Sequence, residues 1–165
     1  MLEKVFQDLV KFEGLSLKVY KCTSGKLTIG YGRNLEDNGI SKKEAELMMI
    51  FDISRLIMEL DRRVNFWKGE PVNVRIVILQ MAFQLGIGGL LGFKRFLAAL
   101  KERDYKLAKK EMLDSRWAKQ TPNRVNELAK YLDTPTTEED NVQWNKDIKL
   151  LREFTNTVSN MSILE

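Results

Sequence analysis

Residues 1–32 read MLEKVFQDLVKFEGLSLKVYKCTSGKLTIGYG, and the spacing of their apolar side chains changes at Gly14. Before Gly14, apolar residues recur at helical spacing, which predicts an amphipathic helix over residues 3–13 with Glu13 on its last turn. From Leu17 to Gly32, apolar and polar residues alternate on either side of a Thr-Ser-Gly turn. This alternation predicts a β-hairpin.

The hairpin pattern also predicts which side chains share a face. A three-residue loop pairs Tyr20 with Thr28. The same loop pairs Cys22 with Lys26, so that Cys22 and Thr28 become diagonal neighbours on one face. We expect the opposite face to belong to the core, and it carries Leu17, Val19, Leu27 and Ile29.

A capping signal begins the long helix that follows the hairpin. Ser41 and Glu44 are spaced as in a capping box, in front of an apolar helical pattern that continues to about Val64. At 1.5 Å per residue this helix is roughly 35 Å long, about the diameter of a small domain. We therefore expect it to connect a small lobe that holds the hairpin with a larger helical lobe.

The rest of the chain carries further helical patterns. Pro71 opens an apolar helix that the glycines at positions 86, 88 and 89 are expected to end. Thr121 followed by Pro122 is typical of a helix start. We expect helices over 93–103, 104–113 and 121–132, and Thr137 with Asp140 suits the cap of a last helix.

The predicted fold class is α+β and mostly helical: a small N-terminal lobe with the hairpin, a connecting helix and a larger helical C-terminal lobe. A chain of 165 residues with 44% hydrophobic residues can form such a core without disulfides. We expect a single domain over 1–165, with the small lobe at 1–40, the connecting helix at 41–64 and the helical lobe at 65–165. The tail at 133–165 has no assigned role.

The residue types exclude several classes of site. The chain has no histidine and one cysteine, Cys22, which rules out an internal disulfide, a Cys/His zinc site and a histidine-based triad. Acid–base chemistry near neutral pH is left to carboxylates, with Cys22 and the lysines as minor candidates. The net charge of +4 is interspersed with acidic residues, which is typical of a solvated surface and does not predict nucleic-acid binding.

The N-terminal segment is unlike a signal peptide, because the charged residues Glu3, Lys4 and Asp8 interrupt its apolar pattern. No segment is expected to span a membrane. We therefore expect a protein made in the cytoplasm, without stable membrane insertion.

Three residues near the junction of helix and hairpin are candidates for chemistry. Glu13 places a carboxylate at the negative end of a helix dipole, which is unfavourable for an ionised group. Cys22 and Thr28 present a thiol and a hydroxyl on one face of the hairpin. Each also has an ordinary structural interpretation: an exposed glutamate at a frayed helix end, a small packed side chain and a β-branched strand residue.

The motifs occur in a characteristic order. Glu13 is followed by Leu17-Lys18-Val19-Tyr20, then Gly25 and Thr28-Ile29-Gly30-Tyr31-Gly32. Further along come Ile40-Ser41-Lys42 with Glu44-Ala45-Glu46, Phe83-Gln84 with Gly86, Gly92-Phe93, and Ser115-Arg116-Trp117 with Gln120-Thr121-Pro122-Asn123-Arg124. Over roughly the first 130 residues, this order resembles the phage-type lysozymes, glycoside hydrolase family 24, and is far more specific than one short motif.

The resemblance implies roles for individual residues. Glu13 would be the general acid, and Thr28 would help to hold the attacking water. Cys22 stands where the family usually has an aspartate, and it would be the base, a water-orienting acceptor or neither. Arg124 would lie in the substrate cleft as the charge partner of Glu13. The same cleft would be lined by Asn34, Phe83, Gln84, Phe96, Glu111 and Ser115.

The activity that the resemblance implies is an inverting muramidase. It would hydrolyse the β-1,4 bond between N-acetylmuramic acid and N-acetylglucosamine in bacterial peptidoglycan, without metal or cofactor. Peptidoglycan is the expected partner, the protein is expected to be a monomer, and a separate membrane pore would release it to the periplasm for cell lysis. Two alternatives stay open: a peptidoglycan-binding module that lost turnover with Cys22, and a basic helical nucleic-acid binder.

Overall fold

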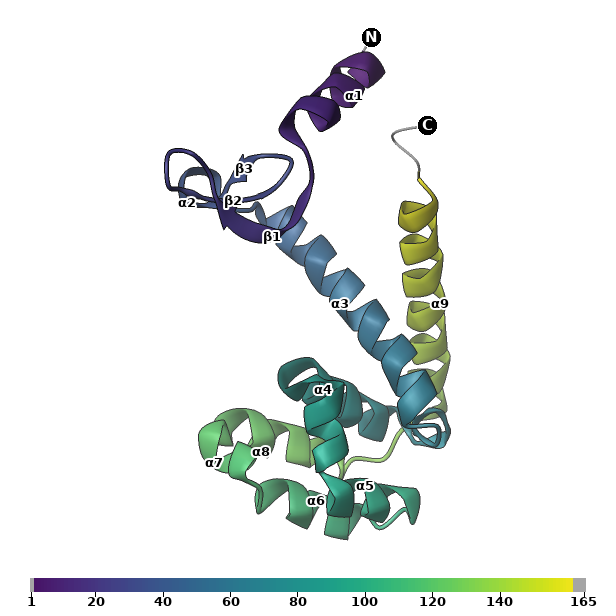
Figure 1. Ribbon diagram of the computed structural model, residues 1–165. Coiled ribbons are helices and arrows are strands. Elements are labelled where there is room, and N and C mark those ends of the chain that lie inside the picture. The colour runs from purple at the N-terminus through teal and green to yellow at the C-terminus, as the bar shows by residue number, and fades with distance from the viewer. Residues whose placement is uncertain (1, 162–165) are drawn as a thin grey trace. The chain divides into compact units, whose positions relative to one another are not determined.

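The computed structural model describes residues 2–161, which form nine α-helices, one short 3-10 helix and three strands (Figure 1). The described residues up to Met49 and from Asn156 onward form one compact unit, and Ile50–Thr155 form a second. The small antiparallel sheet lies near the N-terminus and the remainder is helical. The predicted α+β, mostly helical fold class is confirmed.

The first unit begins with helix α1 (Leu2–Glu13). The helix ends because Gly14 adopts a φ of 67°, and its N–H donates to the carbonyl oxygen of Val10 at 3.2 Å. A glycine in this left-handed conformation is a common helix stop. The predicted first helix is therefore confirmed, with Glu13 as its last residue.

The predicted hairpin consists of strands β1 (Ser16–Lys21) and β2 (Leu27–Gly30). Tyr20 pairs with Thr28, and the N–H of Cys22 donates to the carbonyl oxygen of Lys26 at 3.0 Å, so the predicted register is confirmed. A register shift lies between Ser16 and Tyr20. The structure adds strand β3 (Arg33–Asn34) beside β2 and the short helix α2 (Leu35–Asn38), neither of which the sequence pattern predicted.

The prediction of a buried apolar face on the hairpin is wrong. Leu17 on that face is 82% exposed, whereas Thr28 on the other face is 3% exposed. Thr28 is the only buried residue among the described residues of the first unit. The reason is that β3 and α2, which the apolar alternation does not reveal, both pack against β2.

Helix α3 (Lys42–Arg63) starts at the predicted capping box. The N–H of Glu44 donates to Oγ of Ser41 at 3.2 Å, and the N–H of Ser41 donates to Oε2 of Glu44 at 2.7 Å. These two bonds satisfy N–H groups that have no partner within the helix. The first turns of α3 belong to the first unit and the rest, from Ile50, to the second.

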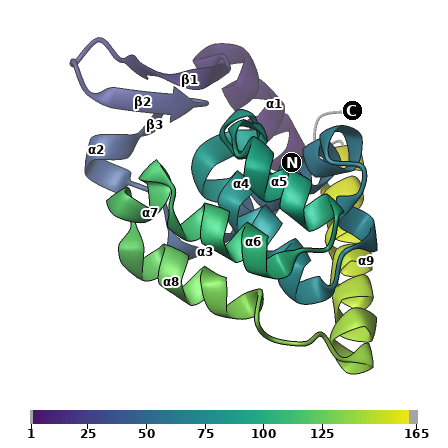
Figure 2. The same cartoon turned by 90° about the horizontal axis from the view of Figure 1, so that it is seen from below.

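The second unit is built around α4 (Val72–Gly92). It also contains the 3-10 helix η1 (Trp67–Gly69) and the helices α5 (Lys94–Lys101), α6 (Tyr105–Leu113), α7 (Arg116–Gln120) and α8 (Pro122–Tyr131). Helix α8 packs against α4 and α6, and α6 also packs against α5 (Figure 2). The fully buried core side chains include Leu60, Val77, Ile78, Met81, Leu90, Leu100, Met112 and Val125.

Helix α4 differs from its prediction in two ways. Gly86 breaks it with φ 71° and ψ 162°, but the chain resumes a helix to Gly92 instead of staying in a glycine turn. Among residues 2–161, α4 is also the one helix whose length and apolar composition would suffice to cross a membrane, which corrects the expectation that no segment reaches this length. Val77, Ile78 and Met81 of α4 are fully buried in the unit's core, as in the core helix of a globular protein.

The last helix of the described residues is α9. Helix α9 (Glu138–Asn160) begins at the predicted cap, where the N–H of Asp140 donates to Oγ1 of Thr137 at 3.1 Å. Helix α7 was not predicted. Thr121 does not cap α8 with its side chain, because its hydroxyl donates to the carbonyl oxygen of Trp117 at 3.1 Å.

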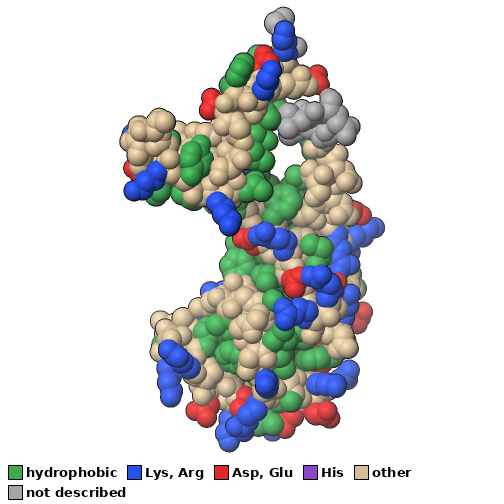
Figure 3. All heavy atoms as spheres, viewed as in Figure 1, with side chains coloured by type: hydrophobic (Ala, Val, Ile, Leu, Met, Phe, Trp, Pro, Cys, Tyr) green, Lys and Arg blue, Asp and Glu red, His purple; other side chains and the backbone are tan. Residues whose placement is uncertain are grey.

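Charged side chains of both signs mix on the second unit. Figure 3 shows Lys and Arg side chains over this unit with Asp and Glu side chains between them. Several are paired, such as Lys109 with Asp133 and Lys130 with Glu127. The face shown carries no uninterrupted basic stripe of the kind that nucleic-acid binding favours.

Candidate functional site

Glu13 lies at the edge of a small pocket within the first unit. The pocket has a volume of about 260 Å³ and is lined by Phe6, Leu9, Val10, Glu13, Tyr31 and Gly32. Glycine at position 32 makes room for the acid, because a Cβ atom there would stand 2.9 Å from Oε2 of Glu13. The arrangement places an exposed carboxylate beside apolar side chains, and its role as a proton donor stays a prediction.

Cys22 directly follows the last residue of β1, where the hairpin loop begins. The loop is closed by the N–H of Gly25, which donates to the carbonyl oxygen of Cys22 at 2.8 Å. The loop brings Oγ of Ser24 to 3.0 Å from Sγ of Cys22. Hydrogen bonds from the side chains of Ser24 and Thr28 lower the pKa of the Cys22 thiol to about 7. Near neutral pH a substantial fraction of this thiol is therefore thiolate.

The causes of this lowered pKa are hydrogen bonds, first those of the Ser24 and Thr28 side chains and then those of the Ser24 and Lys26 backbone. Lys26 forms an ion pair with Asp37. The guanidinium of Arg33 binds the carboxylate of Glu44 through two nitrogens, at 2.5 and 3.2 Å. Both cations thus pair with carboxylates, and the hydrogen bonds that lower the pKa of the thiol come from neutral groups.

Thr28 is connected to the site through its effect on the thiol of Cys22. Its hydroxyl donates to the carbonyl oxygen of Lys26 at 3.1 Å, and it contributes, after Ser24, to the lowered pKa of the Cys22 thiol. Thr28 is 3% exposed, so little of its surface is open to a substrate water. Its role in holding the attacking water stays a prediction.

Asn34 has a structural task that the sequence did not reveal. Its side-chain oxygen accepts hydrogen bonds from the N–H groups of Glu36 and Asp37, both at 3.0 Å, and so caps α2. Its amide nitrogen donates to Asp37 at 2.9 Å. The amide oxygen and the amide nitrogen of Asn34 therefore both have partners within the protein. The predicted contact with substrate would have to form in addition to these bonds.

Phe96 was expected in the substrate cleft, and this prediction is wrong for the structure described. The side chain is 1% exposed and makes an edge contact with the ring of Phe93, at 6.5 Å between centroids. It lies on the buried face of the amphipathic helix α5. Phe96 is a core residue because the helical period of α5 turns it inward.

The other predicted cleft residues of the second unit fall into two groups. Phe83, Gln84 and Arg124 are exposed and open to a ligand. Glu111 forms an ion pair with Arg95 at 2.8 Å, and Oγ of Ser115 accepts from the N–H of Ala118 at 3.0 Å as the cap of α7. Glu13, Cys22, Thr28 and Asn34 belong to the first unit, so a contact between Glu13 and Arg124 stays a prediction.

Two residues of the site were missed by reasoning from sequence. Ser24 was assigned to the turn only, although a hydroxyl two positions after a cysteine can bond its sulfur. Gly32 was noted only as part of a motif. Within residues 2–161, no group of three or more His, Cys, Asp or Glu side chains is arranged to hold a metal ion.

Comparison with known proteins places the chain in a family. The sequence profile described as Phage lysozyme matches residues 10–131. Probable T4-type lysozyme 1 of Dictyostelium discoideum is 29% identical over 79% of this chain and 94% of its own length. The endolysin of Acyrthosiphon pisum secondary endosymbiont phage 1 is 28% identical over 73% of this chain and 82% of its own. Pre-baseplate central spike protein Gp5 of Enterobacteria phage T4 is 27% identical over 91% of this chain but 31% of its own length.

The family match spans well over half of the chain and includes Glu13, Cys22 and Thr28. It ends before the last helix, α9. The sequence motifs, the mostly helical fold with its small sheet and the family profile agree. The chain therefore belongs to the phage lysozyme family and is a glycoside hydrolase, a lysozyme-type enzyme that acts on peptidoglycan.

Proposed function

We propose that the protein is an inverting muramidase that cleaves the β-1,4 bond between N-acetylmuramic acid and N-acetylglucosamine. The observation that carries this proposal is that one unit holds both an exposed carboxylate at the end of α1, Glu13, and a hydroxyl-bonded thiol in the hairpin, Cys22. Hydrolysis of an acetal needs a proton donor for the leaving oxygen and a group that activates water. Glu13 and Cys22 supply one group of each kind.

Glu13 acts as the general acid. Its carboxyl proton passes to the glycosidic oxygen while the bond from that oxygen to the anomeric carbon breaks. The side chains of Phe6, Leu9 and Val10 line the same pocket as Glu13 and provide apolar surface for the sugar beside it. The carboxylate that results is reprotonated from solvent.

Cys22 acts on the water that attacks the opposite face of the anomeric carbon. Its thiolate accepts a proton from this water as the new carbon–oxygen bond forms, which leaves the product with inverted configuration. Ser24 and Thr28 support this role, because their hydroxyl groups favour the ionised sulfur. If Cys22 only oriented the attacking water, its sulfur would not need to ionise. Groups that favour the ionised sulfur therefore support the role of base.

The test is release of reducing ends from purified sacculi by wild-type protein and by Glu13→Gln. We expect the substitution to lower the rate by roughly 100-fold or more while the circular dichroism spectrum is unchanged. Glu3→Gln is the matched control, because Glu3 is an exposed glutamate on the same helix. Wild-type rates in Glu13→Gln would overturn the assignment, and absence of hydrolysis by wild-type protein would favour a binding module.

Two further measurements address the finer claims. Mass spectrometry of the products identifies the cleaved bond and separates hydrolysis from formation of an internal anhydro ring. The anomeric configuration of the first product, followed by NMR, should be opposite to that of the substrate bond. Retention of configuration would contradict the inverting mechanism.

We also propose that the enzyme acts on the cell wall in the periplasm, after release from the cytoplasm. The similarity to a protein named endolysin supports this location. Protein added to cells with a permeabilised outer membrane should lyse them, and intact cells should resist. Lysis of intact cells at the same rate would contradict the proposal.

A further inference from the structure

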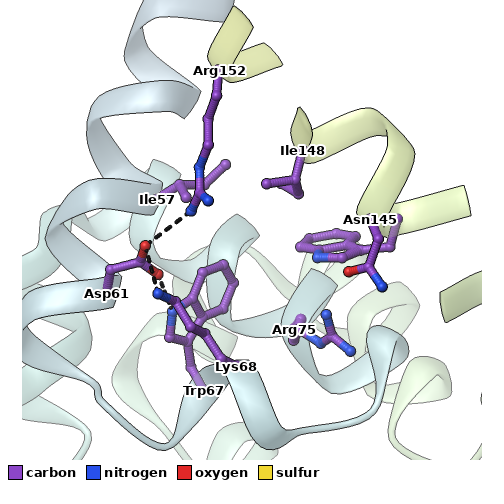
Figure 4. Close-up of a pocket in the computed structure, with 9 residues that line it drawn as sticks. Ile57, Asp61, Trp67, Lys68, Arg75, Asn145, Ile148 and Arg152 are labelled. Carbon is purple, nitrogen blue, oxygen red and sulfur yellow. Dashed lines mark hydrogen bonds and ion pairs between the residues drawn. The ribbon is translucent and has the colours of Figure 1, made fainter. Parts of the chain in front are cut away.

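A second pocket lies inside the second unit, and none of the candidate residues named above lines it. It has a volume of about 210 Å³, and its walls come from α3, η1, α4 and α9 (Figure 4). Pockets for drug-sized ligands measure roughly 300–1,000 Å³, so this space is too small for a glycan chain and fits a group of a few atoms. Helix α9 begins after the last residue of the family match, so family membership assigns no role to this pocket.

One wall of the pocket holds two cations that share one carboxylate. Nζ of Lys68 lies 2.9 Å from Oδ2 of Asp61, and Nη2 of Arg152 donates to the same oxygen at 3.0 Å. Figure 4 shows both cations directed at this carboxylate. The other oxygen, Oδ1, accepts from the indole N–H of Trp67 at 2.9 Å. Both cationic side chains are more than half exposed and carry several N–H donors, and since they meet at one oxygen atom they can bind one small anion together.

The pocket has a third cation, Arg75, which has no carboxylate in its hydrogen bonds to the described residues. Its guanidinium lies 5.6 Å from the ring centroid of Trp144, and it donates to the carbonyl oxygen of Glu70 at 2.7 Å and to the side chain of Asn141 at 3.2 Å. Burial lowers the pKa of Arg75, although the guanidinium stays charged at neutral pH. The carboxylate of Glu70 opposes this shift from outside the pocket, where it accepts from the hydroxyl of Tyr105 at 2.9 Å.

The charged side chains of the lining are therefore unbalanced. Three cations face the single carboxylate of Asp61, which leaves two positive charges in excess. Arginine and lysine bind the oxygens of phosphate-type anions through charge-assisted hydrogen bonds. The rest of the lining is mostly apolar and includes Ile57, Ile148 and Trp144. Apolar walls reduce screening by water, so an anion with two negative charges should be attracted more strongly here than on an open surface.

We infer that this pocket binds a small oxyanion with two negative charges, of the phosphate type. Lys68 and Arg152 donate hydrogen bonds to its oxygens, and Arg75 adds a third positive charge from α4. Because these residues come from η1, α9 and α4, the bound anion joins the last helix to the rest of its unit. Thr155 is the one buried residue of α9, so this helix has few other fully buried attachments. Anion binding therefore stabilises the position of α9.

The test is an NMR titration of the full-length, ¹⁵N-labelled protein with sodium phosphate at constant ionic strength. The chain has three tryptophans, of which Trp67 and Trp144 line the pocket and Trp117 lies in the core elsewhere. Phosphate in the millimolar range should shift the indole signals of Trp67 and Trp144 and leave that of Trp117 in place. Hydrogen exchange of the α9 amides should become slower in the same samples.

Other anions define the ligand. Sulfate also carries two negative charges and should cause the same shifts, whereas chloride at equal ionic strength should not. Methyl phosphate distinguishes two sources of the group. Binding as tight as that of phosphate would identify a phosphoryl group carried by a larger molecule, and much weaker binding would identify the free ion. Either order supports an oxyanion site.

Matched variants locate the anion. Lys68→Gln and Arg152→Gln should each weaken phosphate binding by about tenfold, because each removes a charge-assisted hydrogen bond. Asp61→Asn should tighten it, because it removes the carboxylate that competes for both cations and keeps an oxygen for the indole of Trp67. Arg62→Gln is the control, since Arg62 is an exposed arginine of α3 that pairs with Glu59 and does not line the pocket. The Trp117 signal reports in each variant whether the core is folded.

Several outcomes would overturn the inference. These are unchanged Trp67 and Trp144 signals in phosphate, equal shifts in chloride, or equal weakening by Arg62→Gln. Unchanged affinity in both Lys68→Gln and Arg152→Gln would place the anion elsewhere. Weaker binding by folded Asp61→Asn would contradict the charge argument on which the inference rests.

Discussion

The carboxylate of Glu13 lies against the backbone of Gly32, at a distance that leaves no room for a side chain. A Cβ atom at position 32 would stand 2.9 Å from Oε2 of Glu13. Gly32 also has a φ of 79°, a conformation that disfavours other residues. The turn between β2 and β3 thus fixes the place of an acid that belongs to α1.

A comparison of Gly32→Ala with Gly30→Ala should separate the effect of the contact with Glu13 from the effect of the positive φ. Gly30 has a similar φ of 68°, but a Cβ atom there would meet nothing within 4 Å. Both variants should lose roughly 1–2 kcal/mol of unfolding free energy from backbone strain. Only Gly32→Ala should also lower kcat, by about 100-fold, because it displaces the proton donor. Equal kcat values in the two folded variants would contradict the positioning role of Gly32.

The pH dependence of hydrolysis should report the thiol of Cys22. Because its pKa is lowered to about 7, the thiolate fraction rises as pH increases through this value, and the rate should rise with it. Ser24→Ala removes the largest cause of the lowered pKa, so the rising limb should move to higher pH. Thr23→Ala, in the same exposed loop, should leave it in place. A limb that does not move in Ser24→Ala would show that the thiolate is not the base.

Cys22→Asp should keep or raise activity, because it introduces a carboxylate at the position where the family usually has one. An unperturbed aspartate titrates near pKa 4, so the rising limb should shift to acidic pH. Cys22→Ser cannot ionise in this range and should lose the limb entirely. The measurement is kcat against pH for the three proteins. If all three proteins showed the same rise of kcat near neutral pH, that rise would have to come from a group other than residue 22.

Phe96→Leu and Phe83→Leu should behave in opposite ways. Phe96 is 1% exposed, so its substitution should lower the unfolding free energy by roughly 1–3 kcal/mol without a change in KM. Phe83 is 42% exposed, so its substitution should alter stability by about 0.5 kcal/mol or less and should raise KM if the ring contacts the glycan. Denaturant unfolding and steady-state kinetics measure the two effects. A raised KM in Phe96→Leu would restore its predicted cleft role.

Asn73 should be important for holding the segment before α9. Its side-chain nitrogen donates to the carbonyl oxygens of Thr134 at 2.8 Å and Pro135 at 3.2 Å. Because Asn73 is buried, Asn73→Ala should lower the unfolding free energy by roughly 1–3 kcal/mol. Asn126→Ala, at an exposed position on α8, is the control. Equal stability of the two variants would show that these bonds contribute nothing measurable.

The sequence by itself determined the features that depend on residues close together in the chain. The capping boxes at Ser41 with Glu44 and Thr137 with Asp140 formed as expected. So did the end of α1 at Gly14 and the pairing of Tyr20 with Thr28. In each case the hydrogen bonds join residues in one turn or one hairpin, so local spacing is sufficient to specify them. The order of motifs was sufficient to identify the family.

Only the tertiary structure decided which of the candidate residues are accessible. Phe96 is buried because α5 turns it into a core formed by distant helices, and Thr28 is buried because β3 and α2 pack against β2. The ion pair between Asp61 and Arg152 likewise joins α3 to a helix about ninety residues later in the chain. The burial of a side chain is a sum over all neighbouring atoms, and in a helical core most of those neighbours are distant in sequence, so no local pattern encodes it.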